Sequence, residues 1–172
     1  MDWTPNLSWV LPDLAVGGAF PPGMARRLAE AHGVAAVIDV RVEARDDPEE
    51  LAACGVEFLH LPTEDLCGVS QPMLDEGVAF ARRMAAEARR LLVHCQHGIG
   101  RSATVALCIM VDRGLPPLEA LRVAKDARAL VSPSQAQFEA WTGWMARRRP
   151  QVAAPSYHEF GCIAYRHLAA SA

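Results

Sequence analysis

The chain has few aromatic residues, no long apolar segment and no basic block. Aromatic residues make up 6% of its 172 residues, whereas 51% are hydrophobic and 22% are charged, which is the balance of a globular domain. No apolar run is long enough to span a bilayer, and the N-terminus lacks the basic start and apolar stretch of a signal peptide. We therefore expect a soluble, cytoplasmic protein with no membrane partner.

Paired cysteines are also missing. The five cysteines form neither a C-x-x-C pair nor a secreted disulfide framework, and they lie at positions 54, 67, 95, 108 and 162. This pattern favours reduced thiols in a reducing compartment. The formal net charge of -3 argues against a nucleic-acid partner. The length suffices for one buried core, and no internal repeat is visible.

Apolar runs and helical patterns alternate along the chain and predict its fold class. Runs at 34–40, 56–61 and 91–94 are typical of buried strands. Helices are expected at about 21–31, 45–53, 72–88, 103–111 and 117–127, and another from about 135. Strands separated by helices predict an α/β fold with a central, mostly parallel sheet of four to five strands and helices on both faces.

Residues 94–102 connect a predicted strand to a predicted buried helix, with the sequence His94-Cys95-Gln96-His97-Gly98-Ile99-Gly100-Arg101-Ser102. Backbone N–H groups in such a loop converge beside the positive end of a helix dipole, where an anion is favoured. Gly98 and Gly100 allow the loop to curl around a tetrahedral oxyanion. Arg101 adds a planar fork of donors. The loop predicts a phosphate site built by Gln96, His97, Gly98, Ile99, Gly100 and Arg101.

Cys95 stands where that positive field acts. A free thiol has a pKa of about 8.5, and a helix N-terminus with a nearby cation lowers it by several units. Ser102 is placed to donate a hydrogen bond to the sulfur, and His94 to brace the loop through its ring nitrogens. A cysteine that merely fills the core would require neither the glycines nor Arg101. We therefore predict catalytic roles for Cys95, Arg101 and Ser102, and a supporting one for His94.

The pattern His94-Cys95-x-x-Gly98-x-x-Arg101-Ser102 resembles the signature loop of the cysteine-dependent protein tyrosine phosphatase superfamily. The short chain is similar to the small, atypical dual-specificity phosphatases, as are the segments that begin at Trp9, Val37 and Leu61. The resemblance runs from about Trp9 to Arg149. It implies a catalytic domain at 1–149, followed at 150–172 by a linker and a helix that we expect to pack on the domain.

The resemblance also implies a mechanism. The Cys95 thiolate attacks phosphorus and forms a phosphocysteine intermediate, and Asp65 protonates the leaving oxygen as general acid. Glu64 is the alternative for that role. Water then hydrolyses the intermediate. No metal or other cofactor is required.

Substrate choice is less specified by the sequence. The variable loop positions carry no lysine, whereas phosphoinositide-directed relatives tend to have lysines there. This favours a phosphorylated protein as substrate and partner, with phosphotyrosine first and phosphoserine or phosphothreonine also open. His97-Gly98 resembles the loop of RNA 5′-triphosphatase relatives, so that activity and lipid phosphate hydrolysis are alternatives. A phosphate-binding pseudophosphatase is the non-enzyme alternative. Oligomeric state, pocket depth and a redox role for Cys67 stay open.

Two finer expectations concern the C-terminal third. The spacing of Ser132 and Gln135 is that of a capping box, so Ser132 is predicted to cap a helix whose apolar stripe includes Trp141. Residues 157–169 are expected to form one helix. Its inward side chains are predicted to be Tyr157, Phe160, Ala164 and Leu168.

Overall fold

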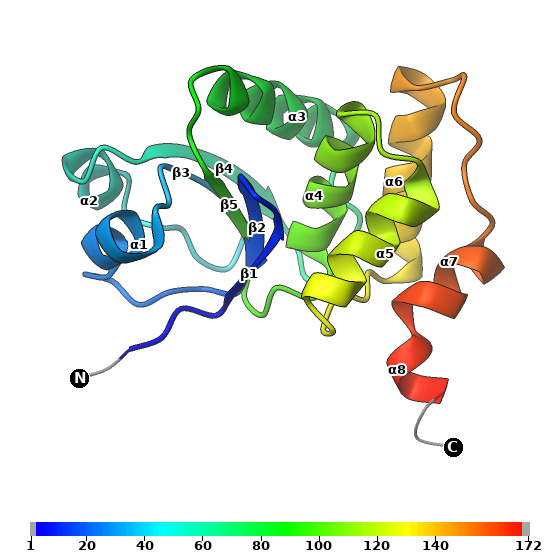
Figure 1. Cartoon of the computed structure of the whole chain (residues 1–172), viewed down its shortest axis with the longest axis horizontal. Coiled ribbons are helices and arrows are strands. Elements are labelled where there is room, and N and C mark those ends of the chain that lie inside the picture. Colours follow the sequence, from blue (N-terminus) through cyan, green and yellow to red (C-terminus); the bar gives the residue numbers. More distant parts are fainter. Residues whose placement is uncertain (1–2, 170–172) are drawn as a thin grey trace.

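A computed structural model describes residues 3–169 and shows a five-stranded sheet between two layers of helices (Figure 1). The strands are β1 (Leu7–Leu11), β2 (Leu14–Gly17), β3 (Ala36–Arg41), β4 (Glu57–Thr63) and β5 (Leu91–His94). Their order is β1-β2-β5-β3-β4. β1 pairs antiparallel with β2, and the other pairs are parallel. The expected α/β fold with a mostly parallel sheet is confirmed.

Two groups of helices cover the sheet. α1 (Ala25–His32) and α2 (Pro48–Ala53) pack on one face. The other face carries α3 (Gln71–Ala86), α4 (Arg101–Asp112), α5 (Pro117–Ala127) and α6 (Gln135–Arg148). Two short helices follow, α7 (Tyr157–Ala164) and α8 (Arg166–Ala169). Among the described residues, no helix is both long and apolar enough to cross a membrane.

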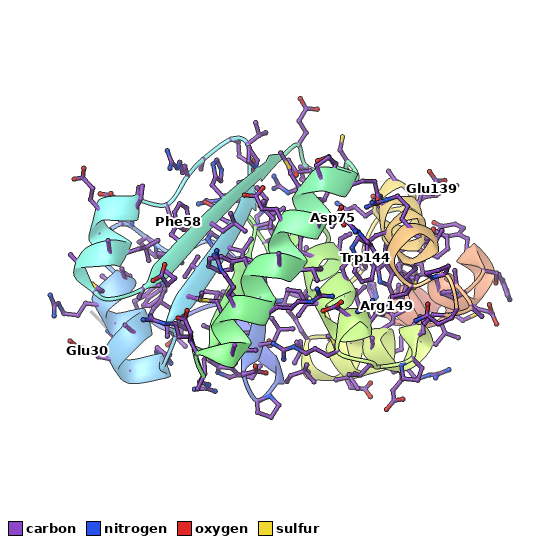
Figure 2. All side chains as sticks on the ribbon, turned by 90° about the horizontal axis from the view of Figure 1, so that it is seen from above. Glu30, Phe58, Asp75, Glu139, Trp144 and Arg149 are labelled. Atoms are coloured by element: carbon purple, nitrogen blue, oxygen red, sulfur yellow. The ribbon has the colours of Figure 1, made fainter. Side chains whose placement is uncertain are left out.

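The central strands are apolar at successive positions because both sheet faces are buried. On β3, Val37 faces the core under α1 and α2, whereas Ile38 faces the core under α4. In Figure 2, Phe58 lies toward α2 and Trp144 lies among the helices of the opposite layer. α4 is the innermost helix, since every residue from Arg101 to Val111 is buried. This agrees with its almost wholly apolar sequence.

The parallel strands end at one edge of the sheet. Gly17 of β2 and Asp39 of β3 are both paired with His94, the last residue of β5. In open parallel sheets, ligands bind at the carboxyl ends of the strands. The loop that follows β5 therefore emerges where neighbouring strand ends place their own side chains.

Three local expectations were wrong. The first helix begins at Ala25 because residues 21–24 form a turn, and α2 begins at Pro48 behind the N-cap Asp47. Ser132 does not cap α6. Ser134 does, because its hydroxyl accepts from the backbone of Gln137, whose side chain returns to the backbone of Ser134. The amide of Ser132 instead donates to the carbonyl of Ile99, in the loop that follows β5.

The C-terminal segment packs on α5 and α6, with Phe160 and Ala164 fully buried. Leu168 is 64% exposed, so its predicted inward orientation was wrong. Tyr157 is 39% exposed, but its ring packs on Phe138 and Phe160, so its predicted orientation is confirmed in part. The predicted single helix breaks at Tyr165, which caps α7. The break changes the helical phase, and the spacing from Ala164 to Leu168 no longer keeps both residues on one face.

Candidate active site

The loop between β5 and α4 curls around the sulfur of Cys95. Gly98 lies at the turn with a φ of 69°, a left-handed conformation that favours glycine. A Cβ atom there would approach the carbonyl carbon of Gly17 to 2.5 Å. The neighbouring strand β2 thus leaves no room for a side chain at this position, and the tight curl of the loop depends on glycine.

The outer side of the loop is held by hydrogen bonds to its carbonyl groups. Arg128 donates to the carbonyls of His97 and Gly98 at 2.9 and 2.8 Å. The amide of Ser132 donates to the carbonyl of Ile99 at 2.9 Å. Because peptide units are planar, carbonyls turned outward leave the next N–H groups facing inward. Arg128 and Ser132 therefore stabilise an inward ring of donors.

Those donors act on Cys95, which is 3% exposed. Burial raises the pKa of the thiol, but hydrogen bonds from the Ser102 side chain and from backbone N–H groups of Ser102, Gly98 and Ile99 outweigh it and lower the pKa. The sulfur lies 3.3 Å from the Ser102 hydroxyl. The local geometry favours a thiolate that faces a nest of N–H donors.

Arg101 is 1% exposed, and hydrogen bonds hold its guanidinium group in place. Its two terminal nitrogens donate to the two carboxylate oxygens of Glu43, each at 2.7 Å, and one also donates to the carbonyl of Thr63. This pairing lowers the pKa of Glu43 to about 2, although burial of the carboxyl opposes it. The buried Nε of Arg101 has no hydrogen-bond partner among the described residues. A buried cationic donor without a hydrogen bond indicates that an anion belongs beside it. In this structure the nearest such group is the carboxylate of Asp65, whose Oδ1 forms an ion pair with the Nε at 3.5 Å.

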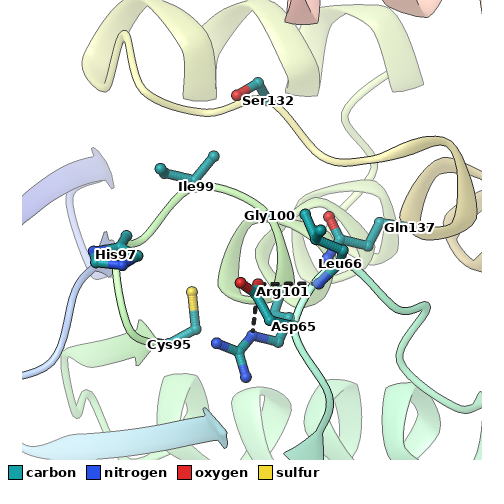
Figure 3. A pocket seen from close by; sticks show the side chains of 9 residues that line it. All are labelled: Asp65, Leu66, Cys95, His97, Ile99, Gly100, Arg101, Ser132 and Gln137. Atoms are coloured by element: carbon teal, nitrogen blue, oxygen red, sulfur yellow. Dashed lines mark hydrogen bonds and ion pairs between the residues drawn. The ribbon is translucent and has the colours of Figure 1, made fainter.

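A small cavity of roughly 100 Å³ opens over Cys95 and Arg101 (Figure 3). Its lining residues are Asp65, Leu66, Cys95, His97, Ile99, Gly100, Arg101, Ser132 and Gln137. Of the predicted phosphate-loop residues, Gln96 and Gly98 lie outside this lining. The side chain of Gln96 instead accepts from Arg41 at 3.2 Å. The structure therefore brings most of the predicted site residues together, and adds three that sequence reasoning left out, namely Leu66, Ser132 and Gln137.

Asp65 and Glu64 differ clearly in position. Asp65 lines the cavity, and its Oδ1 lies 3.5 Å from the Nε of Arg101. Glu64 is not among the lining residues, and its carboxylate lies 4.0 Å from the sulfur of Cys67. Of the two carboxylates, only Asp65 lines the cavity with Cys95.

His94 lies beneath the loop rather than in the cavity. Its Nδ1 is 3.1 Å from the carbonyl of Cys95, and its Nε2 is 2.5 Å from Asp46. Ligand atoms of His94, Asp46 and Asp39 approach one another closely enough for a metal ion. However, Arg41 already donates to both aspartates. Its guanidinium supplies the positive charge that a metal would bring, so these residues do not fit a metal site.

Three residues that support the loop were not identified from the sequence, and they lie far from the loop along the chain. Glu43, Asp46 and Arg128 each contact the loop or its arginine through ion pairs or hydrogen bonds. Charged residues are common in the sequence, and nothing local distinguishes these three from solvated ones.

A buried cysteine whose thiol pKa is lowered, a loop of inward N–H groups and an arginine at a helix start are the features of a cysteine-dependent phosphatase. Here they lie at the strand ends of an α/β sheet. Comparison of the sequence with known protein families supports the same class. The family described as "Dual specificity phosphatase, catalytic domain" matches residues 19–143. The chain belongs to this family, which confirms the resemblance noted from the sequence.

The chain is also similar to individual proteins. It is 32% identical over 130 residues to mouse "Phosphatidylglycerophosphatase and protein-tyrosine phosphatase 1", covering 71% of this chain and 67% of that protein. It is 29% identical over 131 residues to mouse "Dual specificity protein phosphatase 8", covering 75% of this chain but 19% of that protein. The chain thus spans about a fifth of that relative's length. The crystal structure of Tk-PTP in its active form matches with a TM-score of 0.75 at 27% identity, covering 83% of this chain and 98% of that one.

Proposed function

We propose that this phosphatase removes single phosphate groups from proteins, phosphotyrosine before phosphoserine and phosphothreonine. The observation that carries the proposal is the buried Nε of Arg101 at the floor of the cavity, which makes no hydrogen bond within the described residues and has only an ion pair with Asp65 at 3.5 Å. Arg101 is the only permanent cation among the described residues that line it. One arginine and a ring of N–H groups match one phosphate. A phosphoinositide or an RNA 5′-triphosphate brings further phosphates that would need further cations.

The rim of the cavity supports an aromatic leaving group. Leu66 and Ile99 are 69% and 37% exposed and lie on different sides of the opening above Cys95 (Figure 3). Exposed apolar side chains around a binding cavity indicate contact with an apolar group. A phosphotyrosine ring would lie between them while its phosphate reaches the loop.

The proposed mechanism assigns one task to each group. The Cys95 thiolate attacks phosphorus, and Asp65 donates a proton to the leaving oxygen. Arg101 and the inward N–H groups bind the equatorial oxygens. Ser102 stabilises the sulfur as it leaves in the second step, when Asp65 accepts a proton from the attacking water. His94 and the outer hydrogen bonds hold the loop in place.

A lipid monoester is the second candidate. It is favoured by the similarity to the mouse protein whose name includes phosphatidylglycerophosphatase, at 32% identity. Such a head group also presents a single phosphate monoester, which the same cavity would hold. The two candidates differ in what must contact the rim, a peptide or a vesicle surface.

The test is a substrate panel with matched variants. The wild-type chain, Cys95→Ser and Cys67→Ser are assayed on phosphotyrosine peptide, phosphoserine peptide, phosphatidylglycerophosphate vesicles and 5′-triphosphate RNA. We expect the highest kcat/KM on phosphotyrosine peptide, no turnover by Cys95→Ser, and near-normal turnover by the control Cys67→Ser. Turnover by Cys95→Ser would refute the thiolate mechanism. A higher kcat/KM on the vesicles would show that the lipid, and not the protein, is the preferred substrate.

A further inference from the structure

Four charged or titratable side chains are buried together under the phosphate loop. Asp39 and His94 are fully buried, Arg41 is 6% exposed and Asp46 is 8% exposed. Arg41 donates to Asp39 at 2.9 and 3.0 Å and to Asp46 at 3.1 Å. The ring of Phe20 packs against the ring of His94, with a distance of 5.2 Å between the ring centroids. The group is outside the cavity, yet it touches the backbone of the nucleophile.

The hydrogen bonds of His94 determine its protonation state. The carbonyl of Cys95 accepts only, so Nδ1 must carry a hydrogen for its 3.1 Å contact. The Asp46 carboxylate also accepts when ionised, so Nε2 must carry a hydrogen for its 2.5 Å contact. A neutral imidazole has one N–H. Both contacts are therefore satisfied by the imidazolium form.

The charges of the group agree with that form. Asp39 and Asp46 contribute two negative charges, whereas Arg41 contributes one positive charge. An imidazolium at His94 makes the buried group neutral, and a neutral His94 would leave one uncompensated negative charge away from water, which is costly. Burial lowers the pKa of His94, but the hydrogen bond and charge of Asp46, the charge of Asp39 and the bond to Cys95 outweigh it and raise the pKa.

We propose that Asp46 is a positioning residue for the nucleophile: it keeps His94 as an imidazolium, which anchors the Cys95 carbonyl and stabilises the neighbouring thiolate. This rests on the proposed role of Cys95. The action of Asp46 is indirect, because its carboxylate contacts His94 and Arg41 and does not line the cavity. Arg41 extends the same support to the loop through its hydrogen bond to Gln96.

Asp46→Asn is the variant that separates charge from packing. It keeps the side-chain volume, and a neutral His94 could still donate from Nδ1 while Nε2 accepts from the new amide. Asp39 and Arg41 would then balance each other, so the buried group remains neutral. Asp47→Asn is the matched control, since Asp47 is the adjacent, exposed carboxylate that caps α2.

The measurement is the rate of iodoacetamide alkylation of Cys95 against pH, followed by mass spectrometry of the peptide that contains it. Loss of an adjacent positive charge raises a thiol pKa by about 1 unit or more. We expect the alkylation midpoint of Asp46→Asn to rise by about 1 pH unit relative to wild type, and that of Asp47→Asn to stay unchanged. Equal midpoints in all three proteins would overturn the proposal.

A second measurement does not depend on the stability of Asp46→Asn. Nitrogen-15 spectra of the wild-type histidines, with His94 assigned through His94→Gln, should show both ring nitrogens protonated at pH 7. A neutral His94 would refute the proposal even if Asp46→Asn fails to fold. Neither readout requires turnover, so failure of the phosphoprotein assignment is distinguishable from failure of this one.

Discussion

At the scale of single residues, the site depends on how buried charges are paired. Arg101 is almost fully buried, and two of its three guanidinium nitrogens are occupied by Glu43 and the Thr63 carbonyl. A buried arginine without a partner would be costly and would reorient. Glu43 thus fixes the direction in which the Nε points, and the proposed phosphate-binding geometry depends on a carboxylate outside the signature loop.

Replacing Glu43 tests that dependence. In Glu43→Gln the charged pair is lost, so Arg101 is no longer held toward the cavity. We expect KM for p-nitrophenyl phosphate to rise by about tenfold, corresponding to about 1.4 kcal/mol of lost binding, with a smaller effect on kcat. Steady-state kinetics measure both. Glu49→Gln on the exposed side of α2 is the control, and an unchanged KM in Glu43→Gln would contradict the assigned role.

The pH dependence of this pair follows from the lowered pKa of Glu43, about 2 in the folded protein. A carboxyl with a depressed pKa contributes stability that is present above its ordinary value of about 4.3 and is lost as pH falls through the folded value. Between those values Glu43 remains ionised and still holds Arg101. Solvent screening reduces the contribution, since the side chain is 42% exposed.

At the scale of elements, the loop between β4 and α3 depends on a distant helix. The hydroxyl of Ser134, at the start of α6, donates to the carbonyl of Leu66 at 2.7 Å. Leu66 has a φ of 64°, a left-handed conformation that costs a non-glycine residue about 1 kcal/mol or more. That strain persists only with support from surrounding structure. The contact with α6 supplies this support and sets the position of Asp65 next to it.

The loop position gives a prediction for the general acid. Asp65→Asn removes the proposed proton donor, and general acid catalysis contributes about 10²- to 10⁴-fold. We expect kcat to fall by about 10²-fold for phenyl phosphate, whose leaving group is poor, and by much less for p-nitrophenyl phosphate. A leaving-group series measures the difference. Glu64→Gln in the same loop is the matched control, and the reverse ranking of the two variants would assign the acid to Glu64.

At the scale of the whole molecule, the C-terminal segment is joined to the support of the site. Phe160 lies fully buried in the larger core and contacts Phe138 and Trp141 of α6. Tyr165 donates to the carbonyl of Pro133 at 2.5 Å. Pro133 lies between Ser132, which bonds to the loop after β5, and Ser134, which bonds to the loop between β4 and α3. The helices after residue 150 therefore pack behind the wall of the cavity.

Phe160→Ala tests whether this segment and the rest of the chain form one folding unit. Truncation of a buried phenylalanine costs about 3–5 kcal/mol. We expect the free energy of unfolding to fall by that amount in urea, with a single transition retained. Leu168→Ala, at an exposed position of α8, should change it by less than about 0.5 kcal/mol. Equal stability of Phe160→Ala and wild type would show that the C-terminal segment contributes nothing to the fold.

The sequence by itself determined three of the five strands (β3, β4 and β5), most of the helices and the loop of residues 94–102. These features depend on residues close together in the chain. The curl of residues 95–100 follows from two glycines between a strand and a helix, and the chemistry of Cys95 follows from the N–H groups of the same loop. Ser134 rather than Ser132 as the helix cap was missed because overlapping Ser-Pro-Ser residues offer two caps of equal local quality.

Only the tertiary structure decided which charged residues support the site. Glu43, Asp46 and Arg128 reach the loop because the crossover connections of a parallel sheet bring strand ends and helix ends from distant segments to one edge. An ion pair is a property of two side chains and the burial around both. A chain with 20 acidic and 17 basic residues offers too many possible pairs for sequence alone to choose among them.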